Sequence, residues 1–184
     1  SRRWKFAYSG RRADLSVQVG MAFSPDGEAW TEYASNPVIT FPSSVTSATI
    51  GGGEDPYIVR ASDGSAYRDG SGKLHLFAEE KFGTDTPNHR GINHFTSTDG
   101  ITWIPDPTNP GVDPGTVGQW DGGDRTSPVV VHDGSQFVML FEGRPADPAT
   151  NYLGQVGVAR SSDGSTWTVT SGQIIHNGAD GTWD

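Results

Sequence analysis

Three ungapped twelve-residue segments of this chain share one pattern, and this repeat constrains the fold more than any other feature. They are Val19–Trp30, Ile92–Trp103 and Val156–Trp167, and each ends in Ser-x-Asp-Gly-x-x-Trp. An alternating apolar stretch that runs into Asp-Gly is typical of a strand entering a tight turn, because the turn needs a residue with positive φ. A repeat of this length predicts a fold built from several copies of one β unit.

The same order of short strands surrounds each repeat. The strands expected in the two complete units lie at 54–60, 73–80, 92–98 and from Trp103 onward, and then at 127–132, 136–142, 155–161 and 167–175. Four short strands per unit, joined by Gly- and Asp-rich turns, are typical of a β-propeller blade. The inner strands are apolar on both faces, which favours blades packed face to face over a β-sandwich with one wet face.

We therefore expect an all-β chain, a β-propeller of four-stranded antiparallel blades of the five-bladed type. The 25 glycines and 12 prolines among 184 residues also disfavour long helices. The expected strands number three, four and four, which is about two and three-quarter blades in segments 1–50, 51–118 and 119–184 of a single partial domain. Residues 181–184 resemble the lead-in to a further blade. On this expectation, either a longer protein or several copies of the chain as a homo-oligomer complete the ring.

Charge and composition exclude several classes of protein. The chain carries 13 basic and 22 acidic side chains, a net charge of −9, which argues against a nucleic-acid partner. No apolar run approaches the ~20 residues of a membrane helix, so no membrane partner is expected. The absence of cysteine removes disulfides and thiolate chemistry. It leaves the localisation open, since a protein without cysteine can be secreted, periplasmic or cytoplasmic. We expect no cofactor and no metal, because His89 and His94 do not have the spacing of a metal motif.

The units resemble the five-bladed propeller glycosidases and phosphorylases: arabinanases and xylosidases, invertases and levansucrases, and β-mannoside phosphorylases. Trp120-Asp-Gly-Gly123, Phe141-Glu-Gly143 and the repeat at 156–167 match the blade pattern of that superfamily in order. Glu54-Asp-Pro-Tyr57 is similar to its blade opening. The resemblance covers nearly the whole chain. One position departs from the pattern: Ser127 stands where the second blade opening of these enzymes has an aspartate.

The resemblance implies a carbohydrate ligand and the hydrolysis or phosphorolysis of a glycosidic bond by paired carboxylates. Such cleavage needs a general acid and a second carboxylate. The alternative is a relative that binds glycans without cleaving them, or a purely structural propeller. Ser127 favours this alternative, because it removes one expected carboxylate.

Antiparallel connectivity predicts which residues share one end of the blades. First strands begin, and second strands end, at the end opposite to the turns at Asp26, Asp99 and Asp163. The candidate catalytic residues there are Asp55, Glu142 and Glu80; Glu79 and Glu80 are adjacent, so at most one points into the site. The candidate substrate-binding residues are Glu54, Arg125, Arg144, Trp120, His89 and Arg90. The repeated Trp30, Trp103 and Trp167 are interpreted as packing residues.

Overall fold

The computed structural model describes residues 4–13, 16–41, 52–82, 89–147, 154–176 and 178. The expected lead-in at 181–184 lies outside this part of the chain. Within it there are twelve strands and no helix, and hence no helix that could cross a membrane. The strands are β1 (Trp4–Arg11), β2 (Val17–Ser24), β3 (Thr31–Glu32), β4 (Gly53–Ile58), β5 (Arg60–Ala61), β6 (Leu74–Phe82), β7 (His89–Ser97), β8 (Ile104–Pro105), β9 (Asp124–His132), β10 (Phe137–Arg144), β11 (Gln155–Ser161) and β12 (Thr168–Val169).

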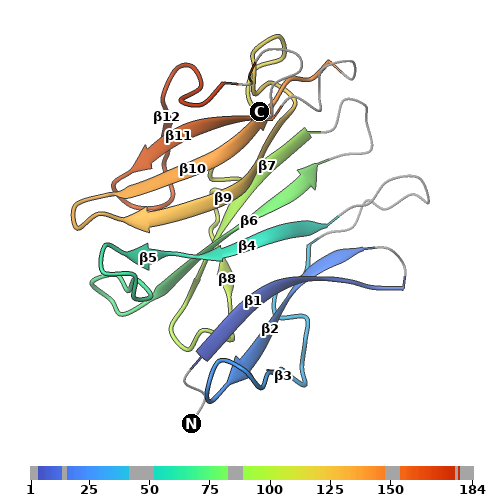
Figure 1. Cartoon of the computed structure of the whole chain (residues 1–184), viewed down its shortest axis with the longest axis vertical. Helices are drawn as coiled ribbons and strands as arrows, with labels where there is room; N and C mark the ends of the chain where they lie inside the picture. The colour runs from blue at the N-terminus through green and yellow to red at the C-terminus, as the bar shows by residue number, and fades with distance from the viewer. Residues whose placement is uncertain are drawn as a thin grey trace.

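The strands form three consecutive antiparallel units (Figure 1), which confirms the expected all-β architecture of blades. Blade 1 has the order β1-β2-β3, blade 2 the order β4-β6-β7-β8, and blade 3 the order β9-β10-β11-β12. Short parallel contacts of β5 and β7 with β9 join blades 2 and 3. The unexpected twelfth strand is β5, the part of the predicted strand at 54–60 that leaves the blade to pair with β9. The predicted outermost strands, from Trp103 onward and at 167–175, are reduced to β8 and β12, and beyond them only isolated pairings such as that of Val156 with Ile175 remain.

Apolar side chains fill the space between neighbouring blades. One buried cluster lies between blades 1 and 2 and includes Val19, Leu76 and Phe95, and a second lies between blades 2 and 3 and includes Phe77, Val130 and Met139. Neighbouring residues of β6 point to opposite faces, so Leu76 packs toward blade 1 and Phe77 toward blade 3. This explains why the inner strands are apolar on both faces.

The three repeats form the same turn. In each turn the serine hydroxyl donates to the aspartate carboxylate, and that carboxylate accepts backbone N–H groups two and three residues later. These bonds lower the pKa values of Asp26, Asp99 and Asp163. The three carboxylates therefore stabilise the turns. The turns lie at the end of the blades that the strand directions predict.

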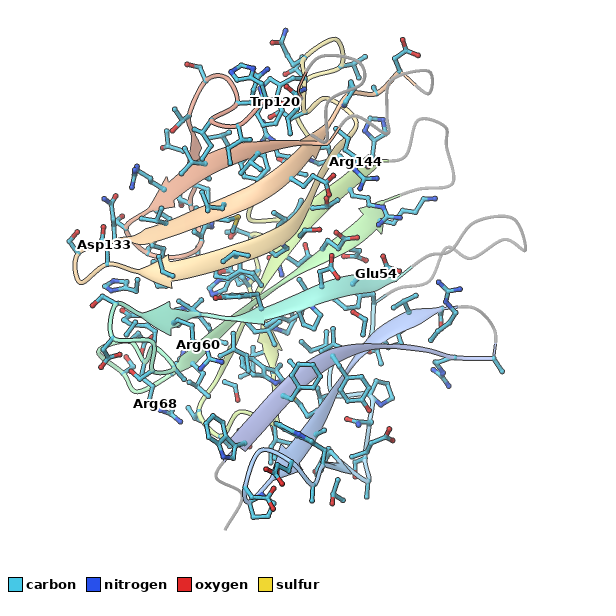
Figure 2. The ribbon with its side chains drawn as sticks, in the orientation of Figure 1. Glu54, Arg60, Arg68, Trp120, Asp133 and Arg144 are labelled. Carbon is cyan, nitrogen blue, oxygen red and sulfur yellow. The ribbon has the colours of Figure 1, made fainter. Side chains whose placement is uncertain are left out.

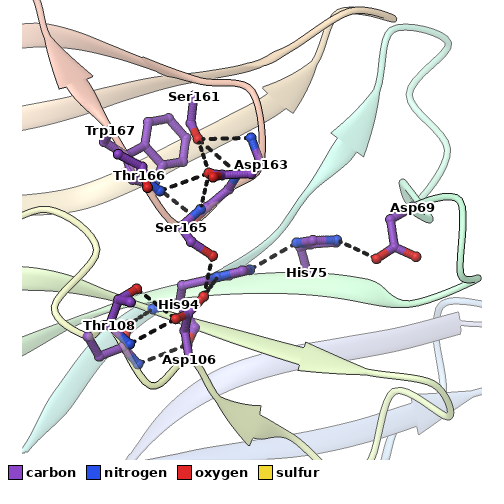
Figure 3. Close-up of polar contacts among 12 residues, drawn as sticks. Asp69, His75, His94, Asp106, Thr108, Ser161, Asp163, Ser165, Thr166 and Trp167 are labelled. Carbon is purple, nitrogen blue, oxygen red and sulfur yellow. Dashed lines mark hydrogen bonds and ion pairs between the residues drawn. The ribbon is translucent and has the colours of Figure 1, made fainter.

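A buried polar chain ties blade 2 to blade 3 near these turns (Figure 3). The ring nitrogens His75 Nδ1 and His94 Nε2 lie 2.9 Å apart, and His94 Nδ1 lies 3.0 Å from Asp106 Oδ2. The hydroxyl of Ser165, in the turn of blade 3, donates to the same Asp106 oxygen. Both imidazoles are almost completely buried, and burial lowers their pKa values, that of His75 to about 4. His94 is thus a buried, hydrogen-bonded residue of the blade interface.

Candidate active site

The openings of blades 2 and 3 share an uncommon backbone conformation. Asp55 has a φ of 48° and Ser127 a φ of 50°, and each residue precedes a proline. A positive φ in a residue other than glycine is rare, and such strain often gathers at functional sites. The shared conformation shows that Ser127 occupies in blade 3 the place that Asp55 occupies in blade 2.

Each of these openings contacts the preceding blade, at the end of β1 for Asp55 and at the end of β6 for Ser127. Ser9, Glu79 and Glu142 hold equivalent positions, because they pair with Val19, Ile92 and Val156, the first residues of the three repeats. The backbone N–H of Asp55 donates to Ser9 Oγ over 3.0 Å. In the same way, the backbone N–H of Ser127 donates to Glu79 Oε2 over 3.1 Å. The fold therefore brings polar groups of successive blades together near the innermost strands.

At this end of the blades lies a small polar cavity of about 180 Å³, called the carboxylate cavity below. Figure 2 shows Glu54 and Arg144, two of its lining residues, on the side away from the turns. Five of its lining residues are acidic and two are basic. The complete lining is Glu54, Asp55, Glu79, Arg90, Asp124, Thr126, Ser127, Glu142 and Arg144.

Glu79 is a deeply buried carboxyl group of the cavity. The residue is 2% exposed, and its burial raises the pKa of Glu79 to about 7. Arg90 opposes this rise by donating from Nη1 to Glu79 Oε1, while the nearby charge of Asp55 adds to the rise. Arg90 also reaches Glu54 Oε2 at 3.3 Å. Glu79 is therefore a carboxyl group able to exchange a proton near neutral pH.

Ser127 connects the two carboxylates of blade 2. Its hydroxyl donates to Asp55 Oδ2 over 2.9 Å, while its backbone N–H donates to Glu79. Asp55 itself is exposed to solvent. One buried and one exposed carboxyl group thus lie on either side of a single residue. Two carboxyl groups in different environments can act as the acid and the base on a bound ligand.

The structure brings together in this cavity five of the nine residues singled out from the sequence: Asp55, Glu142, Glu54, Arg90 and Arg144. Glu142 is partly exposed and forms an ion pair with Arg144, with 3.0 Å between Nε and Oε1.

The other four candidates lie outside the cavity lining. Glu80 points to the opposite face of β6 from Glu79 and accepts from Asn93 Nδ2. Arg125 donates twice to Asp121 Oδ2, and Trp120 stacks on Phe141 with ring centroids 5.9 Å apart. His89 begins β7 and is partly exposed.

Four lining residues were not among the sequence candidates: Glu79, Asp124, Thr126 and Ser127, the last of which the sequence marked only as a departure from the blade pattern. Asp124 and Thr126 follow the Gly122-Gly123 pair, and the polar run from Asp124 to Ser127 at a blade opening was the available signal. Glu79 was weighed against Glu80, but strand alternation alone cannot say which of two neighbours faces the cavity. Among the described residues, no group of three or more histidine or acidic side chains could hold a metal ion.

Comparison with known structures confirms the propeller fold. The chain superposes on a putative glycoside hydrolase from Parabacteroides distasonis with a TM-score of 0.67 and 15% identity, covering 96% of this chain and 51% of that one. A structure from the GH130 family of mannoside phosphorylases gives a TM-score of 0.65 and 13% identity, covering 94% and 48%. A GH32 β-fructofuranosidase from Bombyx mori gives 0.61 and 15%, covering 93% and 34%.

These similarities have a defined extent. The chain spans between about a third and half of the length of these three structures, so it corresponds to part of each propeller enzyme. No protein-family model and no curated protein matches the chain. The fold predicted from the resemblance, a partial propeller, is thus confirmed.

Proposed function

We propose that the carboxylate cavity binds a carbohydrate and cleaves a glycosidic bond, by hydrolysis or by phosphorolysis. The observation that carries the proposal is the pair formed by Asp55 and Glu79, both bonded by Ser127 and different in burial. Solved structures of the same fold include a β-fructofuranosidase and a member of a family of mannoside phosphorylases. Carbohydrate chemistry is therefore compatible with this scaffold.

In this proposal Glu79 is the general acid. Glycosidic cleavage begins with protonation of the leaving oxygen, which requires a carboxyl group that still holds its proton near neutral pH. A pKa of about 7 meets this requirement. Asp55 is the second carboxylate, oriented by the hydroxyl of Ser127 and open to solvent, where it acts on the anomeric carbon directly or through water or phosphate.

The remaining lining residues bind the sugar. Glu54, Arg90 and Arg144 offer acceptors and donors to sugar hydroxyl groups. Glu142, on β10, is the alternative second carboxylate, and its ion pair with Arg144 must open for that role. Glu80, Arg125, Trp120 and His89 have no part in the proposal, since none of them lines the cavity.

Aryl glycosides of several sugars, assayed with and without inorganic phosphate, test the proposal. We expect turnover with at least one sugar, and a loss of about 10²-fold or more for Asp55→Asn and for Glu79→Gln, since neither amide can transfer a proton. Asp133→Asn and Glu28→Gln are matched controls, because both residues are exposed and lie in turns at the other end of the blades (Figure 2 labels Asp133). Equal losses in the controls, or full activity in both site variants, would contradict the assignment.

The second candidate function is glycan binding without cleavage. Ser127 supports it, because a hydroxyl stands where the related enzymes carry a carboxylate. A glycan array distinguishes the two functions: a chain that binds a glycan but turns over none of the corresponding aryl glycosides is a binding protein.

A further inference from the structure

A second cavity, of about 320 Å³, lies between blades 1 and 2 at the opposite end from the carboxylate cavity. It is formed where β1 and β6 begin and where β4 and β5 end. Figure 2 shows two of its residues, Arg60 and Arg68, on the other side of the molecule from Glu54 and Arg144. We call it the cationic cavity, after Lys5, Arg60 and Arg68 in its lining.

The charge of this cavity is unusual in a chain with a net charge of −9. Its lining contains three basic residues and no aspartate or glutamate. By contrast, Arg90, Arg125 and Arg144 each form an ion pair with a carboxylate. Within the described part of the chain, neither Arg60 nor Arg68 forms an ion pair with an acidic side chain. Arg60 and Arg68 therefore give this cavity a local positive charge.

Two of the basic side chains are held in place by neutral acceptors. Arg68 Nη1 donates to the backbone carbonyls of Gly72 and Thr98, and Lys5 Nζ donates to the backbone carbonyl of Asp99. The two carbonyls that accept from Arg68 fix the position of its guanidinium without cancelling its charge. An anionic ligand would thus meet donors that are already ordered, which reduces the entropy lost on binding.

The other walls of the cavity are apolar. Trp4 is 49% exposed, and Ile58 and Leu74 complete the floor beside it. The indole of Trp4 lies against Gly27, since a Cβ added at Gly27 would be 3.6 Å from Trp4 Nε1. An exposed indole next to arginine side chains offers an apolar face and charged donors within one site, the composition expected of a small-molecule pocket.

We propose that the cationic cavity binds a sugar residue that carries a carboxylate, a uronate. The planar guanidinium of Arg60 or Arg68 matches a carboxylate in two parallel hydrogen bonds. The exposed face of Trp4 packs against the C–H face of the sugar ring. The site is separate from the carboxylate cavity, so the proposal does not rest on glycosidic cleavage there.

Two probes that differ in one group test the proposal. Methyl β-D-glucuronide carries a carboxylate where methyl β-D-glucoside carries a hydroxymethyl group. In calorimetric titrations of the whole chain, we expect the glucuronide to bind at least about tenfold more tightly than the glucoside. Added salt should weaken binding of the glucuronide, because the attraction is between charges. Equal affinity for the two probes would overturn the proposal.

Variants locate the binding. Arg60→Gln and Arg68→Gln should each weaken glucuronide binding about tenfold, the usual loss for a charge-assisted hydrogen bond. Arg160→Gln is the matched control, because Arg160 is exposed on β11, far along the chain from this cavity. An equal loss in the control, or no loss in either site variant, would contradict the assignment.

Two further arms separate the alternatives. Inorganic phosphate that competes as strongly as the glucuronide would show a general anion site and overturn the sugar assignment. Asp55→Asn should leave glucuronide binding unchanged. If Asp55→Asn abolishes it, the probe occupies the carboxylate cavity, and the present proposal fails while the proposed function stands.

Discussion

Blades 2 and 3 have the same strand order, yet their openings present different chemistry. Asp55 and Ser127 share a φ near 50° and both precede proline, so the backbone of the two openings is the same. One opening carries a carboxylate, and the other carries a hydroxyl that donates to it. The repeat therefore fixes where a side chain is presented, and the residue at that position alone decides which chemistry it offers.

The second strands of the two blades differ in their surroundings instead. Phe77 and Leu140 hold equivalent positions, and so do Glu79 and Glu142. Phe77 is fully buried because blade 3 covers it, whereas Leu140 is 40% exposed. Glu79 is buried and Glu142 is partly exposed. The same position thus becomes core or surface, and carries a buried or a partly exposed carboxyl group, according to the blade that packs against it.

The largest expected effect separates Phe77 from Leu140. Phe77→Ala should lower the free energy of unfolding by about 3–5 kcal/mol, because it leaves a cavity beside His94 and Trp167. Leu140→Ala should cost less than about 1 kcal/mol, since Leu140 already contacts solvent. Urea unfolding of both variants measures the difference. Similar losses in the two variants would show that the exposed face of blade 3 is covered in solution.

Glu79 should link the stability of the fold to pH. The folded pKa of Glu79, about 7, lies above its unfolded value, so the folded state binds more protons between about pH 4.5 and 7. The contribution of protonated Glu79 to the free energy of unfolding is fully present below pH 4.5. It is lost as pH rises to 7, which lowers the free energy of unfolding by at most about 3 kcal/mol.

Unfolding measurements from pH 4 to 8 check this linkage. Glu79→Gln should remove the decrease in stability across this range, while Glu142→Gln should leave it in place. Each variant is compared by the slope of its free energy of unfolding against pH. The absolute value is not used, because Glu79→Gln also removes the ion-pair partner of Arg90. An unchanged slope in Glu79→Gln would contradict the assignment of the raised pKa.

His75 should give the opposite trend over nearly the same range. Its folded pKa, about 4, lies below the ordinary value of 6.5, so the unfolded chain binds more protons between these values. Stability is therefore lost as pH falls from 6.5 to 4. His75→Val installs the residue type that blade 3 has at the equivalent Val138, and should flatten this loss. His176→Val is the control, because His176 is exposed.

The smallest expected effect concerns the strained backbone of the openings. Ser127→Gly removes the strain energy of the positive φ, because glycine adopts this conformation freely. The same change also removes the hydroxyl that donates to Asp55. The two contributions oppose each other, so we expect a change in stability within about 1 kcal/mol. Ser127→Val keeps the strain of the positive φ and adds a branched side chain, so it should lower the free energy of unfolding more than Ser127→Gly does. Thermal unfolding compares the pair, and a Val variant as stable as the Gly variant would contradict the role of strain.

Much of the fold follows from residues near one another in the chain. The Ser-x-Asp-Gly-x-x-Trp segments predict the turns because their hydrogen bonds are local, as at Asp99, whose carboxylate bonds to residues 101 and 102. The strands before and after them follow from alternation, and strand direction then assigns Asp55, Glu142 and Arg144 to one end.

The candidate site could be predicted from the sequence less completely than the fold. Trp120 and Arg125 looked like ligand-binding residues, because an aromatic ring and a cation at a blade opening suit a sugar. The structure stacks Trp120 on Phe141 and pairs Arg125 with Asp121, and neither residue lines the carboxylate cavity. The cationic cavity was not predicted at all, since Lys5, Arg60 and Arg68 come from three separate segments.

The sequence by itself determined the turns, the strand order and the end of the blades at which the acidic residues gather, because these depend on local hydrogen bonds and on the period of two along a strand. Only the tertiary structure decided that Glu79 rather than Glu80 faces the carboxylate cavity, that its pKa rises, and that Ser127 joins it to Asp55. Those properties depend on burial and on contacts between blades, and the residues that make the contacts lie 48 and 72 positions apart in the chain.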